Sequence, residues 1–464
     1  MVTEASLKKF LYPQQLEAYD KLVAEEGGCV FWAVGRGKTR VALTAMWTIT
    51  NPPFGETLLM PRAIIIVCRR PAFDDWRNEI ATLQFDWAVE EIENVDASKA
   101  LERDTFILCS DGKLISQITV ATLQQLVRFQ QAKGLIVDEG YLFANHQTIR
   151  HKAIRTISKK VPTVLLSGSL MSSRDLIQIY GQVATAGKAL RLAPNPTRFR
   201  SLYQTGIQGQ FFTWYPKPGA FNAIMSKIES FTHVYFPRHK EDSIKEAILK
   251  VKPTQRQLDY FQELRETFAV EGVTEFSHAA TLIIKTQQIS NGWLKGDSGD
   301  ILEFPSTKVD RCVALVDEII ASGKRCVVWC AFRYDIERLL PAILKIKSCN
   351  VATFRSGEDF DSHGWHANKY QVCLATEASG SSVNHFAQVP YGIYFSQDFK
   401  WMSLQQSKGR HTRQNSQHDT TYFYFMHTDK SMDARIYNIV KISASSEKSF
   451  IQAMDVQQWL RKAA

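Results

Sequence analysis

GCVFWAVGRGKTR, residues 28–40, is the stretch of sequence that decides the fold. An apolar run with strand character, 28–34, leads into the turn VGRGKT, and a helical pattern over Thr39–Ile49 follows directly. Glycines in such a turn let backbone amides close around a phosphate at a helix N-terminus, where the helix dipole favours an anion. This context predicts a nucleotide-binding loop made of Gly35, Arg36, Gly37, Lys38, Thr39 and Arg40.

Two side chains of this loop would carry its chemistry. We expect Lys38 to reach the β- and γ-phosphates of a nucleotide, and Thr39 to hold Mg²⁺ through its hydroxyl. Trp32 stands where the first glycine of the GxxxxGK[ST] pattern would be, so the full pattern is not met. A Gly-rich turn that binds no nucleotide is the alternative.

Apolar runs and helical patterns alternate over most of the chain. The runs are continuous rather than alternating with polar residues, which is typical of parallel strands buried on both faces. The alternation predicts an α/β fold with two parallel-sheet domains in tandem, residues 1–240 and 241–464. The strand candidates are 28–34, 63–68, 105–110, 118–123, 134–139 and 161–168, then 325–332, 350–355, 371–376, 391–396 and 420–427. Helices are expected over Phe73–Leu83, Thr254–Ala269, Lys308–Ala321 and Tyr334–Lys345.

Composition limits the class of protein. Of the 464 residues 45% are hydrophobic and 22% charged, which excludes a disordered or collagen-like chain. No apolar run approaches the ~20 residues that span a bilayer, and the N-terminus lacks a signal-peptide core, so we expect a cytoplasmic protein. The eight cysteines form no CxxC pair, and we interpret them as core residues in a reducing compartment. The net charge of +9 suits a polyanionic partner.

GLIVDEGY, residues 134–141, places Asp138 and Glu139 at the end of an apolar strand. Ligand-facing residues of an open parallel sheet lie at the carboxyl ends of its strands. Asp138 would then hold Mg²⁺, and Glu139 would orient and deprotonate an attacking water. A solvated acidic turn is the alternative, but the phosphate loop upstream favours an ATPase.

QQSKGRHTRQN, residues 405–415, contains two arginines three positions apart, Arg410 and Arg413. On a helix they share one face, and phosphoryl transfer needs a positive charge opposite the γ-phosphate. A solvated basic helix or a contact to a phosphate backbone is the alternative.

In this order, the segments resemble the motifs of superfamily 2 helicases, above all the Swi/Snf-type translocases in the compact form carried by bacteriophages. The phage branch-migration helicases are the most specific likeness, and it extends over nearly the whole chain. The matching segments are LYPQQ (11–15), VGRGKT (34–39), AIIIVCRRPAFDDWRNEI (63–80), ITVATLQQL (118–126), DEGY (138–141), LLSGSLMSS (165–173), TLIIKTQQISNGW (281–293), STK (306–308), RCVVWCAF (325–332), ATEASGSSVNHFA (376–387) and QQSKGRHTR (405–413).

The resemblance implies two RecA-like lobes that close on ATP and Mg²⁺ and move along duplex or branched DNA as they open and close. It implies that Gln15 contacts adenine. It assigns catalytic roles to Lys38, Asp138, Glu139, Arg410 and Arg413. It assigns contacts with DNA phosphates to Arg69, Arg70, Thr122, Ser379 and Ser381, although a solvated loop is the alternative for the arginine pair.

Three positions depart from the family pattern. Tyr141 stands where this branch usually has His, Ser382 stands where Gly is usual, and QNS rather than a Gly-Gln ending follows Arg413. None of them removes a charged catalytic group, so we expect an active enzyme.

Several alternatives stay open. The activity could be directed at RNA, or the chain could be a nucleotide-gated scaffold that binds nucleic acid without unwinding it. The aromatic cluster Phe211–Tyr215 is either a wedge that stacks on bases or ordinary core, and we favour core. We interpret His146 and His151 as surface residues rather than metal ligands.

Overall fold

The computed structural model describes residues 3–441 except 34, 52–59, 172–174, 209–211, 236–242, 268, 271–273, 276–278, 356–359, 378–384, 413–415 and 417. For residues 212–213, 265, 267, 269–270, 274–275 and 279–282 it describes the backbone alone. The chain divides into an N-terminal unit within residues 1–237 and a C-terminal unit within residues 238–444. The predicted boundary between 240 and 241 lies in the undescribed segment 236–242 and stays a prediction.

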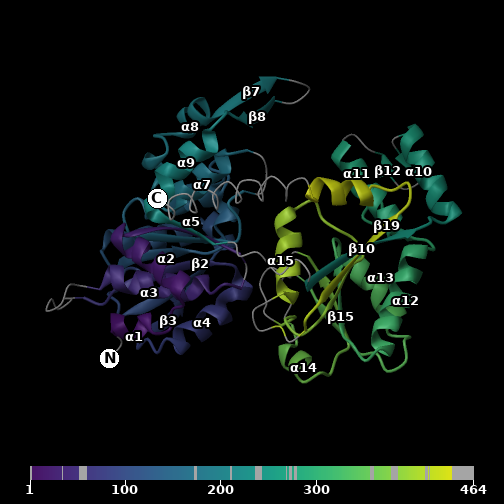
Figure 1. Ribbon diagram of the computed structural model, residues 1–464, viewed down its shortest axis with the longest axis horizontal. Coiled ribbons are helices and arrows are strands. Elements are labelled where there is room, and N and C mark those ends of the chain that lie inside the picture. Colours follow the sequence, from purple (N-terminus) through teal and green to yellow (C-terminus); the bar gives the residue numbers. More distant parts are fainter. Residues whose placement is uncertain are drawn as a thin grey trace. The chain divides into compact units, whose positions relative to one another are not determined.

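The N-terminal unit is built on a seven-stranded sheet in which all neighbouring strands are parallel (Figure 1). In spatial order the strands are β3 (Ala88–Glu91), β4 (Thr105–Ser110), β2 (Ala63–Cys68), β5 (Ala132–Val137), β6 (Thr163–Ser167), β1 (Gly27–Trp32) and β9 (Thr232–Tyr235). The helices are α1 (Glu4–Lys8), α2 (Pro13–Ala24), α3 (Lys38–Thr50), α4 (Phe73–Thr82), α5 (Gln117–Arg128), α6 (Ile149–Ser158), α7 (Ile177–Thr185), α8 (Pro196–Tyr203) and α9 (Ala220–Ile228).

Helices cover both faces of this sheet, which explains the continuous apolar runs. Ile64 and Ile66 of β2 belong to the core that includes residues of α2, α3 and α4. Ile65 and Val67 of the same strand belong to the core formed with α5 and α6. Because neighbouring side chains along a strand point to opposite faces, a strand buried on both sides needs apolar residues at every position.

The C-terminal unit has a second all-parallel sheet with helices on its two faces. Its strands, in spatial order, are β10 (Ile244–Val251), β19 (Thr421–Thr428), β18 (Tyr391–Tyr394), β15 (Cys326–Cys330), β17 (Val372–Thr376) and β16 (Val351–Phe354). Its helices are α10 (Gln255–Thr267), α11 (Ala279–Ser290), α12 (Thr307–Ala321), α13 (Arg333–Ile343), α14 (Ser362–His366) and α15 (Trp401–His411). The strand pairs β11–β12 (Ala269–Val270, Thr274–Glu275) and β13–β14 (Trp293–Lys295, Ile301–Glu303) lie outside the sheet.

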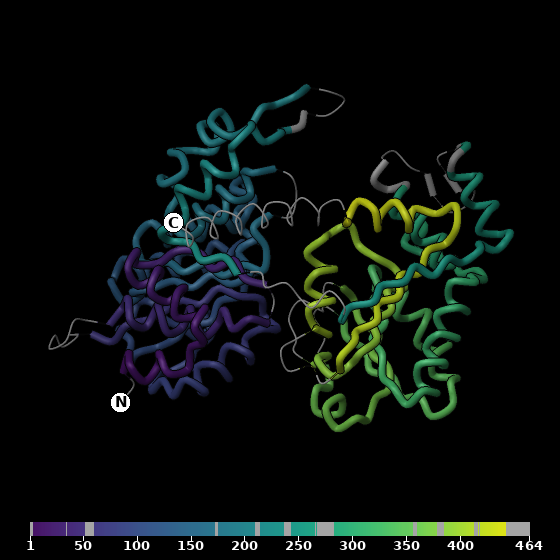
Figure 2. Tube along the Cα trace, in the orientation of Figure 1, coloured from purple at the N-terminus to yellow at the C-terminus, as the bar shows by residue number. Residues whose placement is uncertain are grey.

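The first and last strands of this unit lie side by side. Figure 2 shows β10, at the start of the unit, next to β19, near its end, and eight residue pairs join them from Ile244–Thr421 to Val251–Thr428. The two sheets confirm the expected α/β fold with two parallel-sheet lobes in tandem. None of the described helices has the length and apolar character needed to cross a lipid bilayer.

One predicted strand, 118–123, is wrong, because these residues lie within α5. The Ser116 side chain caps the helix by accepting a hydrogen bond from the Thr119 amide. The buried residues Leu123 and Leu126 are three positions apart, which is a helical spacing. The β-branched run ITV obscured that spacing in the sequence.

The prediction that the aromatic cluster 211–215 is core is also wrong for the residues that the structure describes. Trp214 and Tyr215 lie on β8 (Phe212–Pro216), which pairs antiparallel with β7 (Gln204–Gln208) in a hairpin that projects from the N-terminal unit (Figure 1). Tyr215 is 45% exposed, and the Arg200 guanidinium lies 4.5 Å from the Trp214 ring centre. A two-stranded hairpin has no second layer to bury its aromatic residues.

The interpretation of His151 as a surface residue is wrong too. Its ring is buried within the N-terminal unit, where Nδ1 lies 2.7 Å from the Phe143 carbonyl oxygen. Burial lowers the pKa of His151 to about 4, so the ring is neutral at pH 7.

Candidate active site

The predicted phosphate loop connects the end of β1 to the start of α3. Gly37 is the N-cap of α3 with φ +75°, and Gly35 has φ +77°, so both occupy the left-handed region that favours glycine. A Cβ atom on Gly37 would lie 2.4 Å from Gln15 Nε2, so the end of the Gln15 side chain would have to move. The backbone conformation therefore favours glycine here. Val34, at the start of the motif, is outside the described residues.

Lys38 is the first residue of α3. Its Nζ donates hydrogen bonds to the carbonyl oxygens of Trp32, at 3.0 Å, and Ala33, at 3.3 Å, so the ammonium group lies over the start of the loop. Thr39 follows in the first turn of the helix. The loop thus holds a cation and a hydroxyl at a helix N-terminus, as a phosphate and its Mg²⁺ require.

Gln15 of α2 contacts the same loop, although it precedes the loop by some twenty positions. Its Nε2 donates to the carbonyl oxygens of Arg36, at 3.3 Å, and Gly37, at 3.4 Å. Its Oε1 accepts a hydrogen bond from the Tyr12 amide at 2.8 Å. The structure therefore brings the predicted adenine contact directly to the predicted phosphate loop.

Arg40, also predicted to bind the nucleotide, is held by other protein groups. Its Nε lies 2.5 Å from Glu79 Oε1 of α4, and Nη1 donates to the Phe10 carbonyl oxygen at 3.4 Å. These contacts join α3 to α4 and to the chain before α2.

Asp138 and Glu139 follow β5 at the edge of the sheet that also carries the phosphate loop. The Asp138 amide donates to the Val67 carbonyl oxygen at 2.8 Å, and Trp76 Nε1 lies 3.4 Å from Asp138 Oδ2. The Glu139 amide donates to Asp138 Oδ1 at 2.8 Å, with Glu139 itself in the left-handed region at φ +52°. A left-handed conformation is uncommon for a residue other than glycine.

The strand order sets the spacing between the two motifs. β6 lies between β1 and β5, with Phe31 opposite Ser167 and Val137 opposite Leu165. Neighbouring strands are ~4.8 Å apart, so the ends of β1 and β5 are about 10 Å apart on one edge. A triphosphate with its metal spans such a gap.

The predicted nucleic-acid contacts of the N-terminal unit have different surroundings. Arg69, just after β2, donates from Nη2 to the Tyr141 hydroxyl at 3.2 Å, so the DEGY segment, residues 138–141, is linked to the end of β2. Arg70 forms an ion pair with Glu91 and lies 4.6 Å from the Phe73 ring centre. Thr122 Oγ1 donates to the Ile118 carbonyl oxygen at 3.0 Å within α5. The other two, Ser379 and Ser381, are outside the described residues.

Arg410, in the C-terminal unit, is buried in α15 and is therefore not part of a solvated basic helix. The next residue, His411, holds the helix: its Nδ1 donates to the Val389 carbonyl oxygen at 2.8 Å, and its Nε2 accepts from Trp329 Nε1 at 3.2 Å. Burial lowers the pKa of His411 to about 4, so this pattern persists at neutral pH. Arg413 is outside the described residues.

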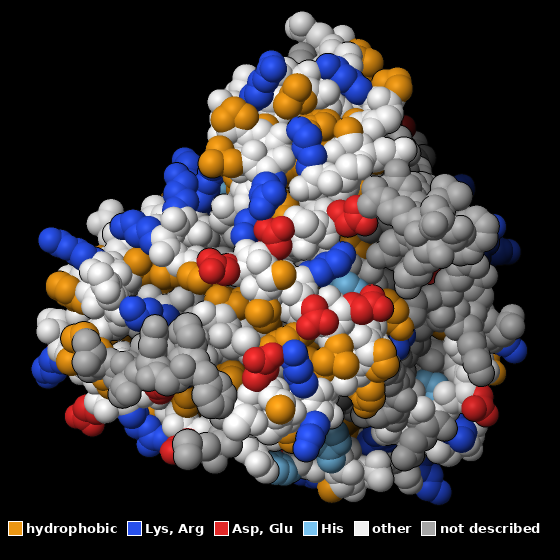
Figure 3. Space-filling view, turned by 60° about the vertical axis from the view of Figure 1, so that its left-hand side comes forward, with side chains coloured by type: hydrophobic (Ala, Val, Ile, Leu, Met, Phe, Trp, Pro, Cys, Tyr) orange, Lys and Arg blue, Asp and Glu red, His pale blue; other side chains and the backbone are white. Residues whose placement is uncertain are grey.

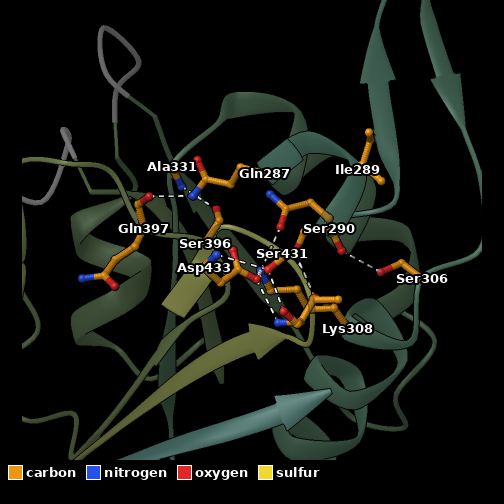
Figure 4. A network of polar contacts seen from close by, with 12 residues as sticks. Gln287, Ile289, Ser290, Ser306, Lys308, Ala331, Ser396, Gln397, Ser431 and Asp433 are labelled. Carbon is orange, nitrogen blue, oxygen red and sulfur yellow. Dashed lines mark hydrogen bonds and ion pairs between the residues drawn. The ribbon is translucent and has the colours of Figure 1, made fainter. Parts of the chain in front are cut away.

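A buried ion pair in the C-terminal unit was missed by sequence analysis. Figure 4 shows Lys308 of α12 and Asp433 pointing toward one another, with Nζ and Oδ2 at 2.9 Å. Ser290 Oγ and the Thr428 amide also donate to Asp433, at 2.8 and 2.9 Å, and Lys308 donates to Asn291 Oδ1 at 3.0 Å. Burial opposes ionisation, but the Lys308 charge and these donors hold the pKa of Asp433 below its usual range.

This ion pair joins α11, α12 and the end of β19. The one indication of this ion pair in the sequence is that Lys308 lies on the apolar face of a helix, beside the buried residues Val309 and Cys312. Close by, the buried carboxylate of Asp335 accepts hydrogen bonds from Asn291 Nδ2, at 3.0 Å, and Trp293 Nε1, at 2.8 Å.

Replacing Lys308 by alanine is expected to lower the free energy of unfolding of the C-terminal unit by about 3–5 kcal/mol, because it leaves the Asp433 charge buried and unpaired. Hydrogen exchange of β15, β18 and β19 amides in the full chain measures the loss, with β5 and β6 as internal reference. The double variant Lys308→Met, Asp433→Leu removes both charges and should recover most of the stability. Equal destabilisation by both variants would contradict this account.

The N-terminal unit contains the part of the chain that matches a known family. Residues 8–167 match the family model of the type III restriction enzyme, res subunit. The match covers about a third of the chain and runs from before α2 to the end of β6, so it includes Gln15, the phosphate loop, Asp138 and Glu139.

Two further comparisons were made with the whole chain. Among solved structures, the Sulfolobus solfataricus SWI2/SNF2 ATPase core in complex with double-stranded DNA is 16% identical, with 98% of this chain and 95% of that chain covered and a TM-score of 0.41. No curated protein matches the chain.

Proposed function

We propose that this protein is a DNA-dependent ATPase of the helicase class, which hydrolyses ATP to move on duplex or branched DNA. One observation carries the proposal: a Gly-Lys-Thr loop and an Asp-Glu pair lie about 10 Å apart on one edge of a parallel sheet, within the segment that matches the res-subunit family. Branch migration or fork unwinding in phage DNA replication, recombination or repair is the finer role, which the segments that resemble helicase motifs favour.

The residues of the N-terminal unit fit a magnesium nucleotide. Mg²⁺ prefers oxygen ligands, and the site offers the Thr39 hydroxyl and the Asp138 carboxylate, whose orientation Trp76 and the Glu139 amide fix. These two oxygens would hold the ion, which when bound neutralises charge on the phosphates. Gln15 would contact the base, and Gly35, Arg36 and Gly37 would surround the phosphates.

Each charged group has a distinct task in the hydrolysis. The Lys38 ammonium stabilises negative charge on the β- and γ-phosphates, and it would exchange its carbonyl partners Trp32 and Ala33 for phosphate oxygens. Glu139 orients the attacking water and accepts its proton. Arg410 and Arg413 of the C-terminal unit complete the positive charge around the transition state. Hydrolysis then depends on both lobes, so each cycle of closing and opening can advance the protein along DNA.

The decisive experiment is an ATPase assay of the full chain with no nucleic acid, with single-stranded, duplex, forked and four-way-junction DNA, and with RNA. Stimulation by duplex or branched DNA supports the proposal, and strand displacement or junction migration in parallel would establish the finer role. Stimulation by RNA alone would make it an RNA helicase. Nucleotide binding without hydrolysis in any condition would make it a nucleotide-gated scaffold.

A further inference from the structure

A basic hollow lies at the amino-terminal ends of the strands of the N-terminal sheet, opposite the ends that carry the nucleotide loop. It has a volume of about 930 Å³ and lies between the C-terminal ends of α5 and α6 and the first residues of β5. Its cationic lining residues are Arg128, Lys133, Lys159 and Lys160, and the lining contains no Asp or Glu. β5 is six residues long, so the hollow is about 20 Å from Asp138 at the strand's other end.

The four cations are not neutralised by the protein. Within the described residues, none of them forms an ion pair or a side-chain hydrogen bond, whereas Arg150 of α6 is paired with Asp111 at 2.8 Å. The C-terminal ends of α5 and α6 contribute roughly half a negative charge each, which four full positive charges outweigh. The hollow therefore attracts anions.

Two of the four cations, Lys159 and Lys160, belong to a strongly basic part of the chain. From Gly140 to Ile228 the sequence has twelve Lys and Arg residues and one acidic residue, Asp175, so this stretch alone exceeds the chain's net charge of +9. Asp175 is itself paired with Arg200 at 2.9 Å. Figure 3 shows more Lys and Arg than Asp and Glu side chains over the upper part of the N-terminal unit. The positive charge is thus concentrated in residues 140–228 and is not spread evenly along the chain.

The polar lining identifies the kind of anion. Gln124, Gln125, Gln130 and Thr156 line the hollow with the cations, and amides and hydroxyls of this kind supply contacts to phosphate oxygens alongside Lys and Arg. No aromatic side chain lines it, so it offers no platform for stacking unpaired bases. An extended phosphate backbone whose bases are already paired fits these features.

We propose that this hollow binds the phosphate backbone of a second DNA duplex segment, separate from the DNA that Arg69 and Arg70 would contact after β2. A branched DNA has such a segment in its second arm, so the hollow would let one protein hold two arms at once. The inference rests on the proposed function, because it requires that a first duplex is bound elsewhere on the protein.

The test uses the triple variant Arg128→Gln, Lys159→Gln, Lys160→Gln, whose three side chains are exposed. A matched control, Lys324→Gln, Lys345→Gln, Lys347→Gln, removes three exposed cations from the C-terminal unit. A biotinylated duplex on beads captures the full-length protein, and retention of a second, fluorescent duplex is measured over a series of salt concentrations. ATP hydrolysis without DNA is measured for each protein.

The wild type and the control are expected to retain the second duplex. The triple variant should bind the first duplex but retain at least about tenfold less of the second, because about three phosphate contacts with the second duplex are lost. Binding of the second duplex should also depend less steeply on the salt concentration in this variant. Its hydrolysis without DNA should be unchanged. Unchanged retention by the triple variant, an equal loss in the control, or wild type that binds one duplex but never a second would each overturn the inference. Failure of the wild type to bind any DNA would instead overturn the proposed function.

Discussion

Replacing Lys38 by alanine is expected to abolish ATP hydrolysis while leaving the N-terminal unit folded. Nζ is the one cation that the structure places over the start of the loop among the described residues, and removing a preorganised charge from a phosphoryl-transfer site costs ~10²–10³-fold or more in kcat. The variant also frees the Trp32 and Ala33 carbonyl oxygens, at about 1 kcal/mol each, which is too little to unfold a domain of this size.

Steady-state phosphate release and the melting temperature, measured on the same preparations, check this prediction. Lys9→Ala, which removes an exposed lysine of the same unit, is the matched control and should hydrolyse ATP normally. If the Lys38 variant kept its melting temperature and a normal rate, this loop would not be the phosphate site.

Arg413→Ala should bind ATP with unchanged affinity and lose turnover by about 10³-fold or more. An arginine that meets the γ-phosphate mainly in the transition state contributes to kcat and little to ground-state binding. Arg410, its partner on the expected face, is buried in α15.

Binding of a fluorescent ATP analogue together with single-turnover hydrolysis separates these two effects. The exposed Arg435 of the same unit supplies the control, and Arg435→Ala should leave both quantities unchanged. Normal turnover by the Arg413 variant would remove it from the catalytic machinery and leave the ATPase proposal to stand on the N-terminal unit alone.

The sequence predicted the two parallel sheets because nearly every strand, such as AIIIVC at 63–68, is a continuous apolar run with one interpretation. It failed at 118–123, where β-branched residues occupy a helix whose spacing of Leu123 and Leu126 is the better guide. It also failed at Tyr215, because an aromatic segment in a projecting hairpin consists of the same residue types as one in a core.

For the candidate site, local patterns located Lys38 and the Asp138–Glu139 pair, because both depend on a strand followed by a turn. Contacts between distant segments left no local pattern. Nothing near Tyr141 predicts its hydrogen bond with Arg69, and nothing near Lys308 points to Asp433, more than a hundred residues later. Such pairs depend on the strand order, which periodicity does not determine.

All eight cysteines lie in the described part of the chain and are buried as free thiols. Burial raises the pKa of Cys109 and Cys312 to about 12, so reactive thiolate is scarce at these positions as well as shielded. The native cysteines of the folded protein should therefore react only slowly with maleimide dyes. One cysteine added to an exposed site on each unit would report their separation by fluorescence energy transfer through a catalytic cycle, with every native cysteine left in place.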